Sequence, residues 1–225
     1  AGDGPAGLAL LSAQAEKGAL QADVPRPASA ANPPSPASPP VTAVAEPFSP
    51  EVAEAACTTL LPRLPGLSRA QCVATRLQAS GALSRQGAPL YWRDVPSHAG
   101  AAAKGEPAAE PLRVLVVGAM HGDELTAASL ALRWIGMAAA EGAVDAGEPA
   151  PVHWRFIPVL NPDGLLAPKP TRVNAGGVDL NRNFPTPNWA RDAKVYWEQR
   201  TRKDPRRWPG PKPLSEPESK FFHEE

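Results

Sequence analysis

The hydrophobic pattern in the second half of the chain changes its period from one segment to the next. Leu112–Val117 is a nearly continuous apolar run rich in β-branched residues, which predicts a strand buried on both faces. Residues 123–140 place apolar side chains three or four positions apart, which predicts an amphipathic helix that starts at Asp123 and Glu124. Residues 152–160 predict another strand. Strand, helix and strand in this order indicate an α/β fold with parallel pairing.

Two short helices are predicted before this core. The first begins at Ser49-Pro50, where serine caps the helix and proline takes its first position, and it ends at Pro62. The second begins with a capping box formed by Ser68 and Gln71 and closes near Gly81, a residue type common after helix ends.

Composition divides the chain into distinct parts. Residues 1–48 are rich in proline and alanine, as in Pro33-Pro-Ser-Pro-Ala-Ser-Pro-Pro40. They predict a disordered tether, because such a segment buries too little surface to offset its ordering entropy. Residues 49–83 hold the predicted helical pair. Residues 84–225 form the α/β part, which opens with an edge strand predicted at Pro89–Val95.

Charge and hydropathy exclude some classes of partner. The chain carries 23 basic and 23 acidic residues. The formal net charge is therefore zero, and no overall electrostatic attraction favours binding to nucleic acid or to an anionic membrane surface. No apolar stretch reaches the roughly 20 residues that a membrane span needs. The sequence leaves the oligomeric state open.

The two cysteines, Cys57 and Cys72, fall one in each predicted helix. An antiparallel helix pair brings such residues within bridging distance, and we favour a disulfide between them. The alternative is a pair of small reduced core residues. A disulfide implies an oxidising compartment, so that the protein is expected to be periplasmic or secreted, with a cytoplasmic location as the alternative.

A possible metal site follows the first buried strand. His121 and Glu124 lie three positions apart where the strand gives way to the helix, at the sheet edge where open α/β folds place their sites. One imidazole and one carboxylate from a single turn, completed by a distant histidine, form the His₂Glu set of catalytic zinc. Taken alone, the spacing also fits a histidine that caps a turn beside a glutamate at a helix start.

A second polar cluster lies between Arg172 and Pro185. It contains two arginines, three asparagines and an aspartate around a Gly-Gly pair. A guanidinium group binds a carboxylate through two parallel hydrogen bonds, and a neighbouring asparagine adds a donor. The segment therefore predicts a carboxylate-binding site, with a solvated polar loop as the alternative.

Four short motifs occur along the chain in the same order as in a known protein family. They are the His121/Glu124 pair, Asn161-Pro-Asp-Gly164, Gly177-Val-Asp-Leu-Asn-Arg-Asn-Phe184 and Ser215-Glu-Pro-Glu218. From about Ser84 onward the chain resembles the M14 zinc metallocarboxypeptidases, and the motif wording is most similar to the bacterial murein peptide amidase branch. The resemblance implies a zinc-carboxypeptidase-like fold, with a mixed, largely parallel sheet and helices on both faces.

The resemblance also implies roles for single residues. His121 and Glu124 match the first two Zn²⁺ ligands of the family. Arg172 matches the arginine that polarises the scissile carbonyl and steadies the oxyanion. Asn181 and Arg182 match the pair that holds the terminal carboxylate of the substrate.

The remaining parts of the family's site are expected later in the sequence. By helix and strand lengths, the third ligand, a histidine, is expected about 20 residues past Glu216, beyond Glu225, and the general-base glutamate later still. Only the N-terminal part of the peptidase domain is therefore expected in this sequence, and activity of this chain as written is doubtful.

Three functions remain open at this point. The leading one is a zinc-dependent carboxypeptidase or peptidoglycan peptide amidase that hydrolyses an amide bond next to a carboxylate by metal-activated water. Its partner is a peptide or murein peptide. The others are a deacylase of N-acyl amino acids with the related fold, and a non-catalytic domain that binds peptides or cell wall.

Overall fold

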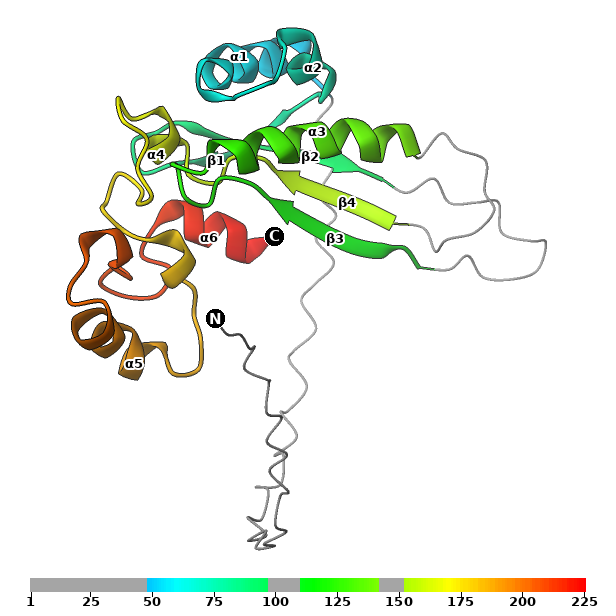
Figure 1. The fold of residues 1–225 in the computed structure, drawn as a ribbon. Coiled ribbons are helices and arrows are strands. Elements are labelled where there is room, and N and C mark those ends of the chain that lie inside the picture. Colours follow the sequence, from blue (N-terminus) through cyan, green and yellow to red (C-terminus); the bar gives the residue numbers. More distant parts are fainter. Residues whose placement is uncertain (1–47, 97–109, 142–151) are drawn as a thin grey trace, which may run out of the picture. The chain divides into compact units, whose positions relative to one another are not determined.

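The computed structural model describes residues 48–96, 110–141 and 152–225, all of which belong to one compact unit (Figure 1). The tether predicted at residues 1–48 lies, apart from Phe48, outside the described residues. So does Gly142, the residue at which the long helix is predicted to end. Within the described ranges, no helix is long and apolar enough to cross a membrane.

A mixed sheet forms the centre of the fold. Its described strands are β1 (Gln78–Leu83), β2 (Pro89–Val95), β3 (Leu112–Val117) and β4 (Val152–Ile157), in the order β1-β2-β4-β3. β3 and β4 pair in parallel, whereas β1–β2 and β2–β4 are antiparallel. The predicted α/β fold with a mixed sheet is confirmed. Among the described strands, parallel pairing is confined to β3 and β4, and β2, which the sequence predicts as an edge strand, lies between β1 and β4.

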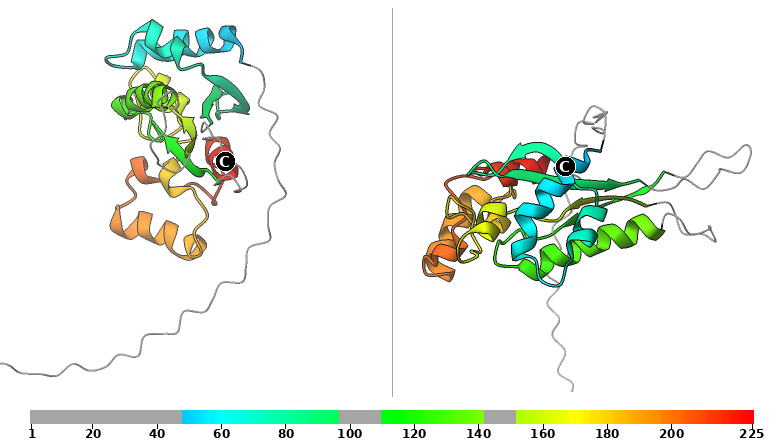
Figure 2. Two further views of the ribbon diagram at one scale, coloured as in Figure 1. Left: turned by 90° about the vertical axis from the view of Figure 1, so that its right-hand side faces the viewer. Right: turned by 90° about the horizontal axis from the view of Figure 1, so that it is seen from above.

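Helices cover both faces of the sheet, as predicted (Figures 1 and 2). On one face, α1 (Pro50–Leu60), which η1 (Leu61–Arg63) follows, and α3 (Leu125–Glu141) enclose a core that contains Phe156 of β4. On the other face, α6 (Pro217–Glu224) places Phe221 against Leu90 and Ile157. The sheet therefore lies between two apolar cores. The polar residues of the predicted site lie at the carboxyl ends of the parallel strands β3 and β4.

Both helices of the pair begin where the sequence predicts, but the predicted end of the second helix is wrong. The Ser49 side chain accepts a hydrogen bond from the backbone of α1, and the capping box of Ser68 and Gln71 opens α2 (Arg69–Ala74). The structure contains the Cys57–Cys72 disulfide, with 5.9 Å between the Cα atoms. The prediction that the second helix closes near Gly81 is wrong. The boundary placed between residues 83 and 84 therefore falls inside the hairpin of β1 and β2.

Two other predicted boundaries shift. The helix predicted from Asp123 begins at Leu125 as α3, so that Asp123 and Glu124 lie in the preceding turn. The strand predicted to run to residue 160 ends at Ile157. The segment that follows β4 forms the short helix α4 (Pro162–Leu166), which the side chain of Asn161 caps by accepting a hydrogen bond from the backbone N–H of Gly164.

The prediction that Leu112–Val117 is buried on both faces is wrong for β3. Leu112 is 60% exposed and Leu115 37% exposed. β3 is an edge strand among the described residues, because only β4 pairs with it there. Val116 and Val117 nevertheless pack against the cores on opposite faces of the sheet. The end of β3 that leads to His121 is therefore anchored on both sides.

The segment between α4 and α6 is built from short helices. They are η2 (Leu180–Arg182), α5 (Trp189–Val195), the π-helix η3 (Tyr196–Arg200) and η4 (Pro205–Arg207). The indole ring of Trp197 packs against that of Trp208, with 4.6 Å between the ring centroids, and donates a hydrogen bond to the carbonyl oxygen of Asp204. These contacts fix η3 and η4 to each other.

Candidate active site

The predicted site residues meet at the carboxyl edge of the parallel pair β3–β4. Past the strand ends the two segments stay joined, since Leu160 donates to the carbonyl oxygen of Gly118 at 3.1 Å and Asn161 to that of Ala119 at 3.0 Å. This pairing brings the turn that carries His121 beside the segment that leads to Arg172. Open α/β folds place their ligand sites at this edge.

Gly122 allows the close approach of the two segments. A Cβ atom at this position would lie 2.2 Å from the carbonyl carbon of Gly164. No side chain fits there, because backbone atoms cannot give way as a flexible side chain can. The glycine next to His121 is therefore required by packing against α4.

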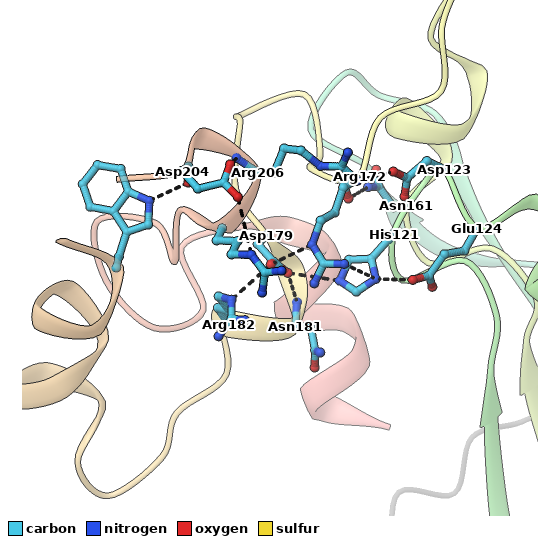
Figure 3. A network of polar contacts seen from close by, with 12 residues as sticks. His121, Asp123, Glu124, Asn161, Arg172, Asp179, Asn181, Arg182, Asp204 and Arg206 are labelled. Carbon is cyan, nitrogen blue, oxygen red and sulfur yellow. Dashed lines mark hydrogen bonds and ion pairs between the residues drawn. The ribbon is translucent and has the colours of Figure 1, made fainter. Parts of the chain in front are cut away.

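His121 is buried and is held at both ring nitrogens (Figure 3). Its Nδ1 atom lies 2.8 Å from Oε1 of Glu124, and its Nε2 atom lies 3.1 Å from Oδ1 of Asp179. Arg172 adds a third neighbour, with Nη1 at 3.3 Å from Nδ1. The ring orientation is thus set by Asp179 on one side, while Nδ1 and the Glu124 carboxylate face each other on the other side.

Asp179 is the residue that joins the predicted positions. It is 0% exposed. Its Oδ2 atom lies 3.0 Å from Nε of Arg172 and 3.2 Å from Nε of Arg182, and its Oδ1 atom accepts the backbone N–H of Asn181 at 3.2 Å. One buried carboxylate therefore contacts the proposed metal ligand, the proposed oxyanion residue and both proposed carboxylate binders.

The contacts with Asp179 shift the pKa values of both partners. Burial raises the pKa of Asp179, but the hydrogen bond from His121 and the charge of Arg172 outweigh it, so that the pKa lies below its usual value. The hydrogen bond to Asp179 raises the pKa of His121, against an opposing effect of burial and with a further increase from Glu124. Asp179 therefore stays ionised at neutral pH and acts as a fixed negative charge behind the imidazole.

A cavity of about 360 Å³ opens beside the predicted carboxylate binders. Asn181 and Arg182 line one part of it. Its other walls come from the segment around α5, and they are Phe184, Thr186, Asn188, Trp189, Asp192, Ala193, Tyr196 and Pro209. Space for a substrate group thus lies next to the guanidinium of Arg182.

The family assignment follows from comparison with known sequences. The sequence profile of the peptidase M14 family, zinc carboxypeptidase, matches residues 73–224. The chain belongs to this family. The curated murein peptide amidase A of Escherichia coli (strain K12) is 34% identical to this M14 chain over 138 residues, which are 59% of this chain and 47% of the relative. The chain therefore spans about half the length of the curated relatives that it matches.

Solved structures of an amidase and of a carboxypeptidase also align with this chain. The crystal structure of murein-tripeptide amidase MpaA from Escherichia coli O157 aligns with 29% identity and a TM-score of 0.38, over 66% of this chain and 54% of that chain. Carboxypeptidase A from Helicoverpa armigera aligns with 20% identity and a TM-score of 0.49, over 69% of this chain and 40% of that chain.

The site of this M14 chain contains one imidazole and one carboxylate side by side, two side-chain types that can bind zinc. Zinc-binding histidines direct one ring nitrogen at the metal and the other at a carboxylate or carbonyl, which is how His121 stands between Glu124 and Asp179. The residues present fit the His and Glu members of a His₂Glu set. No third donor joins them among the described residues. Of the described histidines, His153 lies near Asp94 on β2, and His223 is exposed on α6.

The Ser-Glu-Pro-Glu motif of this M14 chain anchors the site. Glu216 and Glu218 are buried, and both accept hydrogen bonds from the side chain of Asn174, at 2.8 and 3.1 Å. Arg85 donates from its side chain to Glu216 at 2.9 Å and from its backbone to Glu218 at 3.0 Å. The start of α6 is thereby tied to the β1–β2 hairpin and to the loop that follows Arg172.

Sequence reasoning missed Asp179 and the aromatic wall of the cavity. Asp179 belongs to the motif Gly177–Phe184, but no role was predicted for it from the sequence. Its position two residues before Asn181 was the sequence feature that could have indicated a role in the site. Trp189 and Tyr196 carried no such signal, because only the folded segment places α5 beside Arg182.

Proposed function

We propose that the protein is a zinc-dependent peptidase that hydrolyses an amide bond next to a substrate carboxylate. The observation that carries this proposal is the position of His121, whose Nδ1 faces Glu124 while its Nε2 contacts the buried Asp179. This is the environment of a zinc-binding imidazole, and the M14 family to which the chain belongs is the zinc carboxypeptidases.

Each group of the site has a distinct task under this proposal. His121 and Glu124 hold the metal, which supplies Lewis-acid polarisation of a carbonyl and activation of water. Asp179 fixes the imidazole and keeps its orientation. Arg172, whose Nη1 atom lies 3.3 Å from Nδ1 of His121, stabilises negative charge that develops on the carbonyl oxygen. The third ligand and the general base of the family are expected past Glu216 in sequence order.

Asn181 and Arg182 bind the terminal carboxylate of the substrate. The guanidinium of Arg182 borders the cavity, and its Nε atom lies 3.2 Å from Oδ2 of Asp179, so that the terminal N–H groups of the guanidinium are the ones that serve a ligand. Binding at this point orients the adjacent amide bond relative to Arg172. Such positioning turns a bimolecular encounter into a reaction within one complex.

A murein peptide is the proposed substrate class. The support is the 34% identity to a protein named murein peptide amidase A, together with the cavity that Asn181 and Arg182 line. A periplasmic or secreted location is proposed for the same protein. It is supported by the Cys57–Cys72 disulfide, since disulfides persist in oxidising compartments.

Hydrolysis of a matched pair of substrates tests the proposal. The purified protein is assayed with zinc on a γ-glutamyl-diaminopimelate peptide and on an N-acyl amino acid, with and without a chelator. We expect chelator-sensitive cleavage of the peptide that exceeds cleavage of the N-acyl amino acid, and its loss in His121→Ala. Preferential cleavage of the N-acyl amino acid would indicate a deacylase. Binding of the peptide without cleavage, unaffected by chelator, would indicate a non-catalytic binding domain.

A further inference from the structure

Arg182 is held between a carboxylate and an aromatic ring. Its Nε atom lies 3.2 Å from Oδ2 of Asp179, and its guanidinium carbon lies 5.2 Å from the ring centroid of Tyr196. The first contact belongs to the buried centre of the site. The second comes from η3, a separate segment, so that the guanidinium group is restrained from both sides.

The segment that carries Tyr196 is itself attached to Arg182. Trp189, the first residue of α5, donates a hydrogen bond from its indole Nε1 to the carbonyl oxygen of Arg182 at 2.7 Å. Tyr196 follows α5 directly and lies about two helical turns further on, which places it on the same side of the helix as Trp189. Trp189, the first residue of α5, therefore contacts the backbone of Arg182, and Tyr196, the residue after the last turn of α5, contacts its side chain.

The helical geometry changes where Tyr196 occurs. Tyr196–Arg200 forms a π-helical segment directly after the regular turns of α5. Single π-helical turns are rare and occur frequently at functional sites. Here the segment presents a tyrosine ring to a guanidinium group that the proposed function assigns to substrate binding.

Among the described residues that line the cavity, one is a cation. Arg182 is the basic residue among those that line it, and Asp192 is the acidic one. Asp192 is already paired with Arg191 and accepts a hydrogen bond from Asn188 at 2.7 Å. A carboxylate that enters the cavity is therefore attracted by Arg182, and Tyr196 forms part of the wall next to it.

We propose that Tyr196 is a positioning residue, which holds the guanidinium of Arg182 in the orientation that binds the carboxylate of the substrate's terminal residue. The inference rests on the proposed role of Arg182. An arginine side chain loses considerable rotamer entropy when it is ordered by a ligand. The ring of Tyr196 and the carboxylate of Asp179 order it before the ligand arrives, and such preorganisation increases affinity.

The size of the effect follows from the exposure of the contact. Tyr196 is 44% exposed. A cation–π contact at an exposed site changes an equilibrium by about two- to five-fold. Tyr196→Ala should raise KM for a peptide with a free terminal carboxylate by this factor and lower kcat by less. The same substitution should leave KM unchanged for the peptide whose terminal carboxylate is capped as an amide, because that group carries no charge for Arg182.

Two further variants separate positioning from general stability. Tyr196→Phe keeps the ring face and loses only the hydroxyl group, so it should restore KM to the wild-type value. Val195→Ala alters the exposed neighbour that does not line the cavity and should change neither substrate's KM. Equal KM values for wild type and Tyr196→Ala would overturn the inference. So would an equal rise for both peptides, or a Tyr196→Phe variant as impaired as Tyr196→Ala.

Equilibrium binding of the two peptides distinguishes this inference from the proposed function. If the wild type hydrolyses neither peptide with zinc present, the proposed function fails. Tryptophan fluorescence titration with the same peptides then tests the inference alone. A two- to five-fold weaker affinity of Tyr196→Ala for the carboxylate peptide supports it, whereas equal affinities, or no binding of the carboxylate peptide to the wild type, refute it.

Discussion

Replacing Asp179 with asparagine is the change that best separates the proposed site from an ordinary polar loop. Asn keeps the shape of the side chain and removes its negative charge. The 0% exposed carboxylate contacts His121 at 3.1 Å, Arg172 at 3.0 Å and Arg182 at 3.2 Å. The substitution therefore leaves two guanidinium groups and an imidazole without their shared anion.

The expected loss of stability is large for one substitution. Removing one partner of a buried ion pair costs about 3–5 kcal/mol. The side chains of Arg172 and Arg182 are 19% and 28% exposed, so that water partly replaces the lost carboxylate and the low end of this range, about 3 kcal/mol, is expected. Zinc affinity should fall by about 10- to 100-fold, because the imidazole loses the group that orients it.

Urea unfolding without metal and a zinc titration measure the two effects of Asp179→Asn. Asp123→Asn is the matched control, since Asp123 lies in the same turn as His121 but pairs at 2.8 Å with Arg206, which is 63% exposed. The control should lose no more than about 1 kcal/mol. Equal stability and equal zinc affinity of the two variants would refute the role of Asp179.

Three further predictions concern the framework of the site. Replacing Cys57 and Cys72 with alanine should lower the free energy of unfolding by about 3 kcal/mol, because the disulfide closes a loop with a sequence separation of 15, and urea unfolding of the variant should match that of the reduced wild type. Gly122→Ala should lower the melting temperature, because the added Cβ atom would lie 2.2 Å from a backbone carbon. Gly136→Ala is the matched control in α3: a Cβ atom there would have no other atom within 4 Å, so this substitution should stabilise the helix by about 0.5–1 kcal/mol. Burial raises the pKa of Glu218 in the folded protein. As the pH rises, the carboxyl group of Glu218 therefore loses its proton in the unfolded chain before it does so in the folded protein. The contribution of Glu218 to stability falls between these two pKa values. Urea midpoints should therefore fall less over this window in Glu218→Gln than in the wild type, and parallel curves would contradict the assignment.

The half of the site that depends on short sequence distances could be predicted. His121 and Glu124 lie three residues apart, and a strand followed by a helix was enough to place them at the sheet edge. The contact of His121 with Asp179 spans a sequence separation of 58 and depends on the parallel pairing of β3 with β4. Nothing in the local sequence encodes that distance.

The wrong boundary at Gly81 shows where a local signal is ambiguous. Gly81 adopts a φ of 83° in β1, at an irregularity in the pairing of β1 with β2. A glycine after a helix commonly adopts the same left-handed conformation. One residue type thus serves both structures, and only the pairing with β2 decides between them.

The exposure of β3 shows a different limit. An apolar, β-branched run predicts a strand that fits between neighbours, but the run does not identify those neighbours. In the described residues β4 covers one side, which leaves Leu115 37% exposed. The pattern therefore predicted the strand correctly and its surroundings incorrectly.

The metal site is the central claim, and zinc anomalous diffraction from crystals grown with Zn²⁺ tests it most directly. The account predicts an anomalous peak that contacts both Nδ1 of His121 and the carboxylate of Glu124, with Nε2 of His121 still on Asp179. A peak at another site, such as His153 with Asp94, or a metal bound through Nε2 of His121, would contradict it.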